Sequence, residues 1–551
     1  MRYATENDER VRRRILPVRV VKTWGNVENV QALLEDKQGE AYLGHYDGCT
    51  LTSRADAHAA VLLDFGAEFH GTLRITTELV NGAVQTVNVR VRFGESASEA
   101  LAPLGWKGAC NDHAERDRVY ALGALSTRES NESGFRFAYI ELEDEDCLQL
   151  HAVQGVRIER DLARLGSFEC DDALVNCIFE TAARTTHLCM QNYLWDGIKR
   201  DRLVWMGDMH TEVLTILNLF GGQDVVTKSL DFLKSHTPVT GWMNNMPSYS
   251  LWWVIVNHDW YLYTGDETYL KKQREYLTAL ARRLVNLVDE TGCEQMPGKF
   301  LDWPTSEDKA ASHEGMQGLL KLALDDAARM LAVLGEKALS ETCAETARRM
   351  QKHGAEPSGS KAAAAILSIA GAADAHVINS ERLAKDGARG YSCFMGGYIM
   401  EARALDGDVQ GALDDMRAFW GGMLQMGATT FWEDFSVDWM QNAAPIDEIV
   451  PEGKKDIHGD FGAYCYRGFR HSLCHGWSSG PATFLLRYVL GVKPLEPGFA
   501  RVRVRPQLGD LRYAKGTVPT PKGLLRVEAE RQPDGSVRVK IDAPEGITVE
   551  Q

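Results

Sequence analysis

Residues 168–190 read FECDDALVNCIFETAARTTHLCM and set the pattern for most of the chain. Apolar residues recur here every three or four positions, which is the spacing of one face of an α-helix. The same spacing returns in later runs, such as TYLKKQREYLTALARRLVNLV at 268–288 and EGMQGLLKLALDDAARMLAVL at 314–334. It predicts about ten to twelve helices over roughly three hundred residues.

The connections between these helices alternate in length. Short turns such as TGDE at 264–267, GEKA at 335–338 and DGDV at 406–409 are interleaved with long loops rich in aromatic and charged residues. A ring of helical hairpins produces this alternation, because short turns close one end and long loops line a funnel at the other. The pattern predicts an (α/α)6 helical barrel over residues 161–490.

Strand-like segments flank the helical region on both sides. TVNVRVRFG at 86–94 and FRFAYIELE at 135–143 alternate polar and apolar residues between turns, which predicts an N-terminal β-sandwich over 1–160. Strands return after Gly491, with a hairpin signal PDGS at 533–536, and predict a small C-terminal β-sandwich over 491–551. The predicted fold is therefore multidomain and mainly α. The N-terminal domain is expected to be an accessory or packing domain rather than a dedicated carbohydrate-binding one.

Composition, charge and cysteine usage limit the partners and the cellular compartment that we expect for the protein. The 551 residues carry a net charge of −16, and an acidic surface repels phosphate backbones, so nucleic acid is not an expected partner. No run of about 18 apolar residues suggests a membrane span. The first residues, MRYATENDERVRRR, lead into no apolar segment, and eleven scattered cysteines fit reduced thiols. We expect a cytoplasmic protein.

The densest group of charged residues is WDGIKRDRLVWMGD at 195–208, between two helical runs. It holds three acids, Asp196, Asp201 and Asp208, among three bases and two tryptophans. Cleavage of a glycosidic bond needs a carboxylic acid and a carboxylate, and a carboxyl group among other acids has a raised pKa that keeps it protonated. The alternative is a salt-bridge network that only fixes the loop.

Two further segments carry candidate chemistry. GATTFWEDF at 427–435 places Glu433 beside Trp432, whose apolar wall should raise the pKa of the carboxyl group and suit it to activate water. HSLCHGWSSGP at 471–481 contains His475, which could line a pocket. The alternative for Glu433 is a glutamate in the first turn of a helix, and the alternative for His475 is a structural histidine. FLDW at 300–303 and PSYSLWW at 247–253 are aromatic loop ends for which core packing is the default.

Metal-ligand spacing is missing from the sequence. DIHGD at 456–460 comes nearest, but a second suitably spaced histidine is absent and a loop is the favoured interpretation. We therefore predict no metal site and no cofactor.

Together with the domain order, these motifs resemble the α-L-rhamnosidases of glycoside hydrolase family 78, which are six-hairpin glycosidases. Residues 195–208 resemble the family's acidic loop, commonly written DCPxRDERLGWTGD, and GATTFWED at 427–434 resembles its general-base loop GATTxWE. FLDWPT at 300–305, the helix from 247 to 266 and GTVPTPKGLLRVE at 516–528 resemble further family segments. The resemblance covers roughly residues 167–528.

The resemblance implies a role for individual residues. Asp201 falls at the general acid when counted back seven positions from Asp208, a register that Trp205 and Gly207 keep, although the family commonly has glutamate there. Counted forward five from Asp196, it would fall on the residue before the acid. Glu433 matches the general base. The substrate-binding residues implied or singled out beside them are Asp196, Arg200, Trp205, Asp208, Trp253, Asp302, Trp303, Trp432 and His475.

The implied activity is hydrolysis of a terminal α-L-rhamnosyl bond with inversion, without a cofactor. The expected partner is a rhamnose-containing oligosaccharide or glycoside, and a homo-oligomer is compatible with the sequence. Three alternatives stay open: a hydrolase of another deoxysugar or of a uronic acid glycoside, a glycoside phosphorylase, and a non-catalytic sugar-binding homologue.

Overall fold

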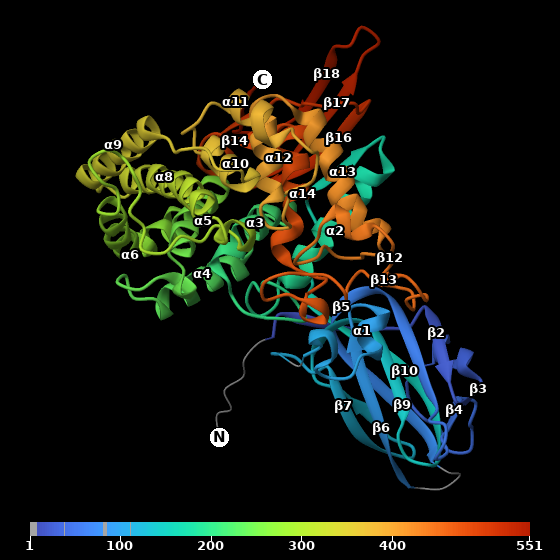
Figure 1. Cartoon of the computed structure of the whole chain (residues 1–551). Helices are drawn as coiled ribbons and strands as arrows, with labels where there is room; N and C mark the ends of the chain where they lie inside the picture. Colours follow the sequence, from blue (N-terminus) through green and yellow to red (C-terminus); the bar gives the residue numbers. More distant parts are fainter. Residues whose placement is uncertain (1–7, 38, 81–84, 111) are drawn as a thin grey trace, which may run out of the picture.

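The structure is a computed structural model that describes residues 8–37, 39–80, 85–110 and 112–551. Figure 1 shows an N-terminal sheet domain in blue, a helical domain in green to orange and C-terminal sheets in red. The multidomain organisation predicted from the sequence, with sheets on both sides of a helical region, is confirmed.

The N-terminal sheet domain is organised around β5, which is 21 residues long. The first part of β5 pairs with β2 and the later part with β10, so one strand serves both regions of the sheet. In β6 the alternate residues Val87, Val89, Val91 and Phe93 are buried, as expected for a strand with one face on a core. The elements are β1 Arg10–Ile15, β2 Arg19–Trp24, β3 Asn26–Glu28, β4 Cys49–Thr52, β5 Ala60–Val80, β6 Thr86–Gly94, α1 Ala97–Leu101, β7 Asp117–Gly123, β8 Thr127–Glu129, β9 Ser133–Leu142 and β10 Cys147–Arg160.

The helical domain follows the predicted apolar spacing. Its helices begin at residues that satisfy free backbone amides, such as Asp266 before α6 and Asp308 before α8. The elements are α2 Ala173–Cys189, α3 Met206–Leu219, α4 Asp224–His236, α5 Pro247–Thr264, α6 Glu267–Val285, α7 Trp303–Ser306, α8 Lys309–Val333, α9 Lys337–His353, α10 Lys361–Ile369, α11 Ala375–Ile378, α12 Gly396–Leu405, α13 Val409–Gln425, α14 Gly480–Phe484 and the short strands β12 Ala443–Ala444 and β13 Lys455–Asp456.

The helices fall into two groups by burial. Every residue of α3 is buried, and α5 is buried on nearly all sides, whereas α6 and α9 bury one face and expose the other. Helices that are apolar all round lie inside a protein.

Contacts run from α3 to α5, α8, α10, α12 and α14 in turn, and α14 contacts α3 again.

The long loops of the helical domain lie against the N-terminal sheet domain. Figure 1 shows α1 at the end of the sheet domain that faces the orange loops around β12 and β13. The backbone amide of Ala97, the first residue of α1, donates to the carbonyl of Ile446 in these loops. The first domain therefore contacts the helical domain at these loops.

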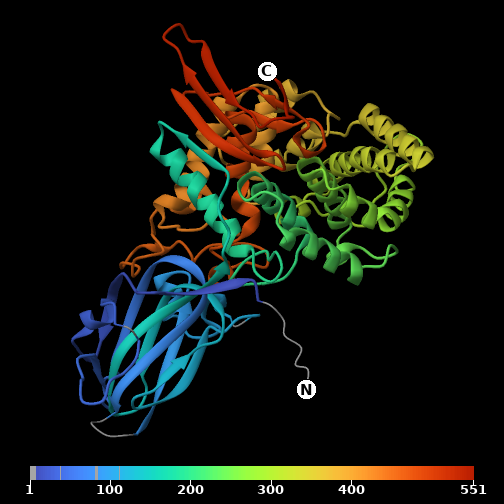
Figure 2. The same cartoon turned by 180° about the vertical axis from the view of Figure 1, so that it is seen from behind.

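The C-terminal part consists of two small sheets, and one of them takes a strand from far back in the chain. β11 (Ser167–Cys170) pairs antiparallel with β16, although it lies inside the range 161–490 that was predicted as the helical domain. Figure 2 shows these strands beside the start of the helical domain. The elements are β14 Val492–Pro494, β15 Arg501–Val504, β16 Tyr513–Thr520, β17 Gly523–Arg531, β18 Val537–Asp542 and β19 Thr548–Glu550.

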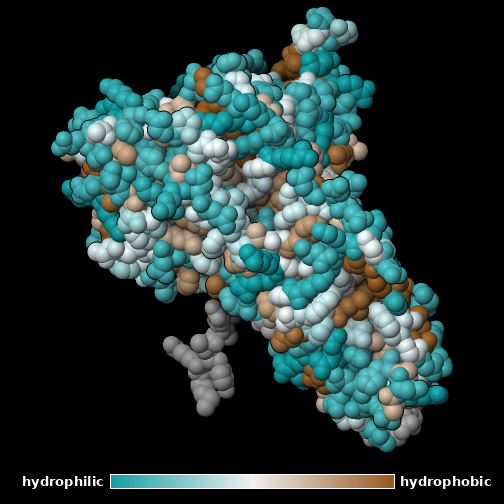
Figure 3. Space-filling view, viewed as in Figure 1, coloured by the Kyte–Doolittle hydropathy of each residue, from teal (hydrophilic) through white to brown (hydrophobic). Residues whose placement is uncertain are grey.

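The surface is mostly polar. Figure 3 shows a largely hydrophilic face over the helical domain, with hydrophobic patches beside the N-terminal sheet domain. In the part of the chain that the structure describes, every helix is too short or too polar to cross a bilayer.

Candidate active site

The loop of residues 195–205, between α2 and α3, is built around Asp196. The Asp196 carboxylate accepts hydrogen bonds from the backbone amides of Asp201, at 2.9 Å, and Leu203, at 3.0 Å. The peptide bond between Arg200 and Asp201 is cis. The loop therefore folds back over the Asp196 carboxylate, and we call residues 195–205 the acid loop.

Glu433 lies in the loop after α13, on residues 427–435, which we call the base loop. Ser472 holds Glu433 from both sides: its amide donates to Glu433 Oε2 at 3.0 Å, and its carbonyl accepts from the Glu433 amide at 2.9 Å. The amide of His475 donates to Phe431 in the same way, at 2.9 Å. The segment 471–477 thus fixes the base loop through backbone hydrogen bonds.

Arg200 and His475 join the two loops. The Arg200 guanidinium contacts Asp201 Oδ1 at 3.1 Å with Nη1 and hydrogen-bonds Glu433 Oε1 with Nη2. His475 Nε2 lies 3.6 Å from Asp196, 3.8 Å from Asp208 and 3.8 Å from Glu433. The Arg200 guanidinium therefore reaches both carboxyl groups that were predicted to react, Asp201 and Glu433. The His475 imidazole faces three carboxyl groups, those of Asp196, Asp208 and Glu433.

The four carboxyl groups differ in exposure and in pKa. The Asp201 side chain is 21 % exposed, whereas those of Asp196, Asp208 and Glu433 are 4 to 6 % exposed. Burial raises the pKa of Asp201, against the opposing effect of Arg200. Burial also raises the pKa of Asp208, to about 8. Burial therefore favours the protonated form of both Asp201 and Asp208, and most strongly that of Asp208.

The pKa of Glu433 shifts in the opposite direction to the one predicted from its neighbour Trp432. Burial acts to raise the pKa of Glu433, but the charges of Arg200 and His475 outweigh it and the pKa lies below its ordinary value. The prediction of a raised pKa was therefore wrong, because the sequence did not show that Arg200 pairs with Glu433. A lowered pKa leaves Glu433 ionised at neutral pH, as a general base requires.

The pKa of His475 is raised. Burial acts to lower it, but the neighbouring Asp196, Glu433 and Asp208 carboxyl groups outweigh burial. Asp196 in turn keeps a lowered pKa, because His475 and the two loop amides outweigh its burial. His475 therefore lies among carboxyl groups that favour its protonated form, next to the Arg200 guanidinium.

An aromatic belt connects the elements around these charges. Neighbouring rings of the belt have centroids between 4.3 and 6.4 Å apart. Asp208 joins the belt through the Tyr249 hydroxyl, at 3.4 Å. In order, the belt consists of Trp205, Tyr249, Phe300, Trp303, Tyr464, Tyr466, Trp477 and His475.

Three of the predicted site residues belong neither to the belt nor to the charged centre formed by Asp196, Arg200, Asp201, Asp208, Glu433 and His475. Trp253 is fully buried, and its ring faces Tyr276 of α6 at a centroid distance of 5.0 Å. The Asp302 carboxylate caps α7 through Thr305 and accepts from Ser392. Trp432 is 1 % exposed and packs on Phe435 behind Glu433.

Several residues at the site were not among the predicted ones. Tyr249 and Phe300 belong to the aromatic segments quoted from the sequence, and Trp477 follows His475, so adjacency to a motif could have found them. Tyr464 and Tyr466 come from a loop without a motif, where the only signal is the density of aromatic residues and glycines in FGAYCYRGF at 461–469.

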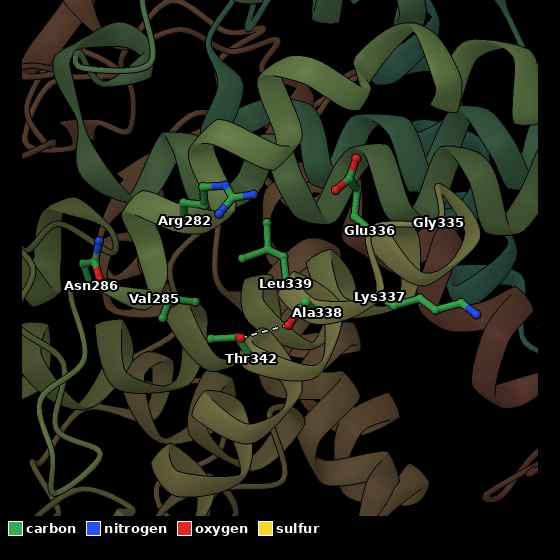
Figure 4. Close-up of a pocket in the computed structure, with 9 residues that line it drawn as sticks. All are labelled: Arg282, Val285, Asn286, Gly335, Glu336, Lys337, Ala338, Leu339 and Thr342. Carbon is green, nitrogen blue, oxygen red and sulfur yellow. Dashed lines mark hydrogen bonds between the residues drawn. The ribbon is translucent and has the colours of Figure 1, made fainter.

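A hollow elsewhere on the molecule does not belong to this site. It has a volume of about 640 Å³, and Figure 4 shows its lining on α6 and on the turn before α9, with Arg282, Glu336 and Lys337 at its sides. The carboxylate of Glu336 is bound by Arg274. The hollow is a groove between α6 and α9 and lacks the paired carboxyl groups of the acid and base loops.

The helical and C-terminal regions match known protein families. Residues 163–356 match the family model of the bacterial alpha-L-rhamnosidase 6 hairpin glycosidase domain, and residues 491–550 match that of the bacterial alpha-L-rhamnosidase C-terminal domain. An alpha-L-rhamnosidase of Alteromonas sp. (strain LOR) is 29 % identical over 133 residues, which are 24 % of this chain and 12 % of that protein.

Solved structures share the fold at low sequence identity. A GH78 family rhamnosidase of Bacillus sp. GL1 superimposes with a TM-score of 0.74 at 22 % identity, covering 95 % of this chain and 55 % of its own. A rhamnosidase from Klebsiella oxytoca with rhamnose bound gives a TM-score of 0.69 at 20 % identity, covering 87 % and 96 %.

The Streptomyces avermitilis alpha-L-rhamnosidase complexed with L-rhamnose gives a TM-score of 0.70 at 16 % identity and covers 89 % of this chain and 48 % of its own. This chain therefore spans about half the length of the Bacillus and Streptomyces structures. The resemblance predicted from the sequence is confirmed: residues 163–356 match the 6 hairpin glycosidase domain model of bacterial alpha-L-rhamnosidases, and residues 491–550 match their C-terminal domain model.

Proposed function

We propose that the chain is an inverting glycoside hydrolase that releases terminal α-L-rhamnose. The observation that carries this proposal is the Arg200 guanidinium, which contacts the Asp201 and Glu433 carboxyl groups from two loops far apart in the sequence. The raised pKa of Asp201 supports a proton donor, and the lowered pKa of Glu433 supports a base. The family matches of the helical and C-terminal domains support rhamnose as the sugar.

The proposed mechanism has two proton transfers in one displacement. Asp201 gives its proton to the departing glycosidic oxygen while Glu433 removes a proton from water attacking C1 on the opposite face. The carboxyl groups of an inverting enzyme stand about 6.5–9.5 Å apart to leave room for that water. Asp196 and Asp208 accept from sugar hydroxyl groups, and His475 orients the water. The belt residues Trp205 and Trp303 pack on the apolar face of the deoxysugar.

We further propose that the contact series from α3 through α14 is an (α/α)6 barrel, with α2, α4, α6, α9, α11 and α13 as its outer helices. In this arrangement the acid and base loops share the end of the barrel that meets the N-terminal sheet domain. The belt rings, which come from connections between helices and from the first turns of α5 and α7, are then the wall of a single funnel.

The test is turnover of an aryl α-L-rhamnoside, followed by NMR of the anomer that is released first. Release of β-L-rhamnose supports inversion, and release of the α anomer contradicts it. Activity on aryl glycosides of another deoxysugar or of a uronic acid, without activity on the rhamnoside, would change the substrate. Strict dependence on phosphate would indicate a phosphorylase, and rhamnose binding without any turnover would indicate a binding protein.

A further inference from the structure

The N-terminal sheet domain reaches the acid loop through a buried cluster of charges. Lys199, which precedes Arg200, directs its ammonium group away from the site and into this cluster. Its Nζ lies 3.0 Å from Glu95 Oε2 and 3.1 Å from Glu99 Oε1, and it also donates to the carbonyl of His471 at 2.6 Å. Glu95 and Glu99 are 0 % and 1 % exposed. Desolvated ion pairs with this many hydrogen bonds fix geometry strongly, because separating them leaves buried charges unpaired.

Glu95 also holds the segment that fixes the base. Its Oε2 accepts from the Leu473 amide at 2.7 Å, and its Oε1 accepts from the Ser472 hydroxyl at 3.3 Å. Ser472 is the residue whose amide and carbonyl bind Glu433. One carboxylate of the first domain therefore contacts the support of the base loop on one side and, through Lys199, the acid loop on the other.

The local fold explains why Glu95 can reach so far. It stands between the end of β6 and Ser96, the N-cap of α1, and its amide donates to Glu99 Oε2 at 2.8 Å. Gly94 allows this close turn, because a side chain there would lie 2.3 Å from the backbone of Ala100. The Ser96 hydroxyl bonds His458 Nδ1 at 2.8 Å. The turn is thus wedged into the helical domain.

The ammonium group of Lys199 serves as the cation of this cluster. Glu95, Glu99 and His458 place their ligand atoms within 4.8 Å of one another, as a metal site would. Lys199 contacts both carboxylates, and its pKa is raised because they outweigh its burial. The buried carboxyl group of Glu68 also lies near this cluster, because burial and then the charges of Glu95 and Glu99 raise its pKa.

We propose that Glu95 is a positioning residue that sets the acid loop and the base loop relative to each other, so that the N-terminal sheet domain is part of the catalytic apparatus. This inference rests on the proposed hydrolysis and goes beyond it by making a second domain necessary for the chemistry. Glu95 does not touch the sugar, so its loss should act on the alignment of Asp201 and Glu433 and hence on kcat more than on KM. A misplacement of about 1 Å in such groups costs up to about 10²-fold in rate.

The experiment compares Glu95→Ala with Glu78→Ala in the full chain. Glu78 is a matched control: it is also 0 % exposed, belongs to the same domain, binds a backbone amide, that of Gly48, and pairs with His151 at 2.9 Å. It lies ten residues along β5 from Glu68, which is roughly 30 Å of strand. We expect Glu95→Ala to lower kcat by about 10- to 100-fold with a smaller change in KM, and Glu78→Ala to leave both near wild type.

Glu95→Gln provides the rescue. Its amide oxygen can accept from Leu473 and Lys199 while its nitrogen donates to Ser472, so we expect most of kcat to return. Equal kcat values for Glu95→Ala and Glu78→Ala would overturn the proposal, as would a failure of Glu95→Gln to differ from Glu95→Ala. If Glu95→Ala does not fold, Glu95→Asp takes its place, because it keeps the charge but withdraws it from Leu473, and a normal kcat for that variant would overturn the proposal.

A second measurement separates this inference from the proposed function. Hydrogen–deuterium exchange should rise in residues 196–203 and 430–434 of Glu95→Ala and stay at wild-type levels there in Glu78→Ala. If the wild-type chain has no rhamnosidase activity, the proposed function fails while exchange still tests the coupling. Unchanged exchange in both segments of Glu95→Ala would remove the basis for a positioning role.

Discussion

The acid loop and the base loop each present one carboxyl group to Arg200, yet they hold it differently. Asp201 is partly exposed and has no backbone amide on its carboxylate among the described hydrogen bonds, whereas Glu433 is buried and bound by the Ser472 amide. The pKa shifts differ in direction: burial prevails at Asp201, and the charges of Arg200 and His475 prevail at Glu433. Two carboxyl groups that share one cation can therefore have pKa shifts of opposite direction when they differ in burial and hydrogen bonding.

The largest effect should come from removing the base. Glu433→Gln keeps the size of the side chain and a hydrogen-bond acceptor but cannot take a proton from water. We therefore expect kcat on an aryl α-L-rhamnoside to fall by about 10²–10⁴-fold. Glu401→Gln is the control, because Glu401 is another partly buried carboxylate of the helical domain and accepts a hydrogen bond from the Tyr488 hydroxyl. A Glu433→Gln variant with near-normal kcat would end the assignment of the base.

The loss of kcat in Asp201→Asn should be smaller than in Glu433→Gln and should depend on the leaving group. A weakly basic aryl oxygen leaves without much help from an acid, so the comparison of the two loops predicts a modest loss on activated aryl rhamnosides. On alkyl or sugar rhamnosides we expect a loss of at least about 10²-fold in kcat. The measurement is kcat across a series of leaving groups. Near-normal turnover on all of them would move the acid to Asp208 or Asp196.

Arg200→Met should change the pH dependence. Because Arg200 lowers the pKa of Glu433, its removal should raise that pKa, and the base would then stay protonated up to a higher pH. The acidic limb of the pH profile of kcat/KM should therefore move to higher pH. Arg202→Met is the matched control, since Arg202 stacks on Trp195 at 4.8 Å and binds the carbonyls of His113 and Glu132. An acidic limb that stays in place in Arg200→Met would contradict the pairing.

His475→Ala tests whether the imidazole of His475 acts together with the base Glu433. If His475 orients the attacking water, its contribution matures in the transition state, and its loss should lower kcat rather than raise KM. We expect a loss of about 10-fold in kcat, below that of Glu433→Gln. Steady-state kinetics on the same rhamnoside measures it, and a pure KM effect would make His475 a residue for sugar binding instead.

The smallest effect should be at the belt. Trp303→Ala removes a ring that would pack on the sugar equally in the ground and transition states, so KM should rise several-fold while kcat stays nearly unchanged. Trp253→Phe is the control, because Trp253 faces Tyr276 and not the belt. If Trp253→Phe raises KM as much as Trp303→Ala does, the belt is not the sugar-binding wall.

What the sequence could predict depended on how far apart the cooperating residues are. The acid loop is contiguous, so Asp196, Arg200, Asp201 and Asp208 appear together in one motif, and the helical spacing of 168–190 was enough to predict a helix. Trp253 shows that a motif does not predict which way a helical side chain points. One residue turns a side chain by about 100° around a helix, so Trp252 stacks on His210 while its neighbour Trp253 faces Tyr276.

Partners that are distant in the chain could not be predicted. The pairing of Arg200 with Glu433 joins positions 233 residues apart, and it reverses the pKa shift expected for Glu433. The contact of Lys199 with Glu95 likewise crosses a domain boundary and leaves no periodic trace in the sequence. Burial patterns report which face of an element is covered, but they do not report what covers it.

The pairing of β11 with β16 has a consequence for synthesis and folding of the chain. Ser167–Cys170 must wait for its partner until more than 340 further residues have been made, because it pairs with Tyr513–Thr520. Closing such a long segment is a slow, non-local step. Until β16 arrives, the edge of β11 is available to strands of other nascent chains. Truncations that remove β16 should therefore yield a helical domain that associates through this exposed edge.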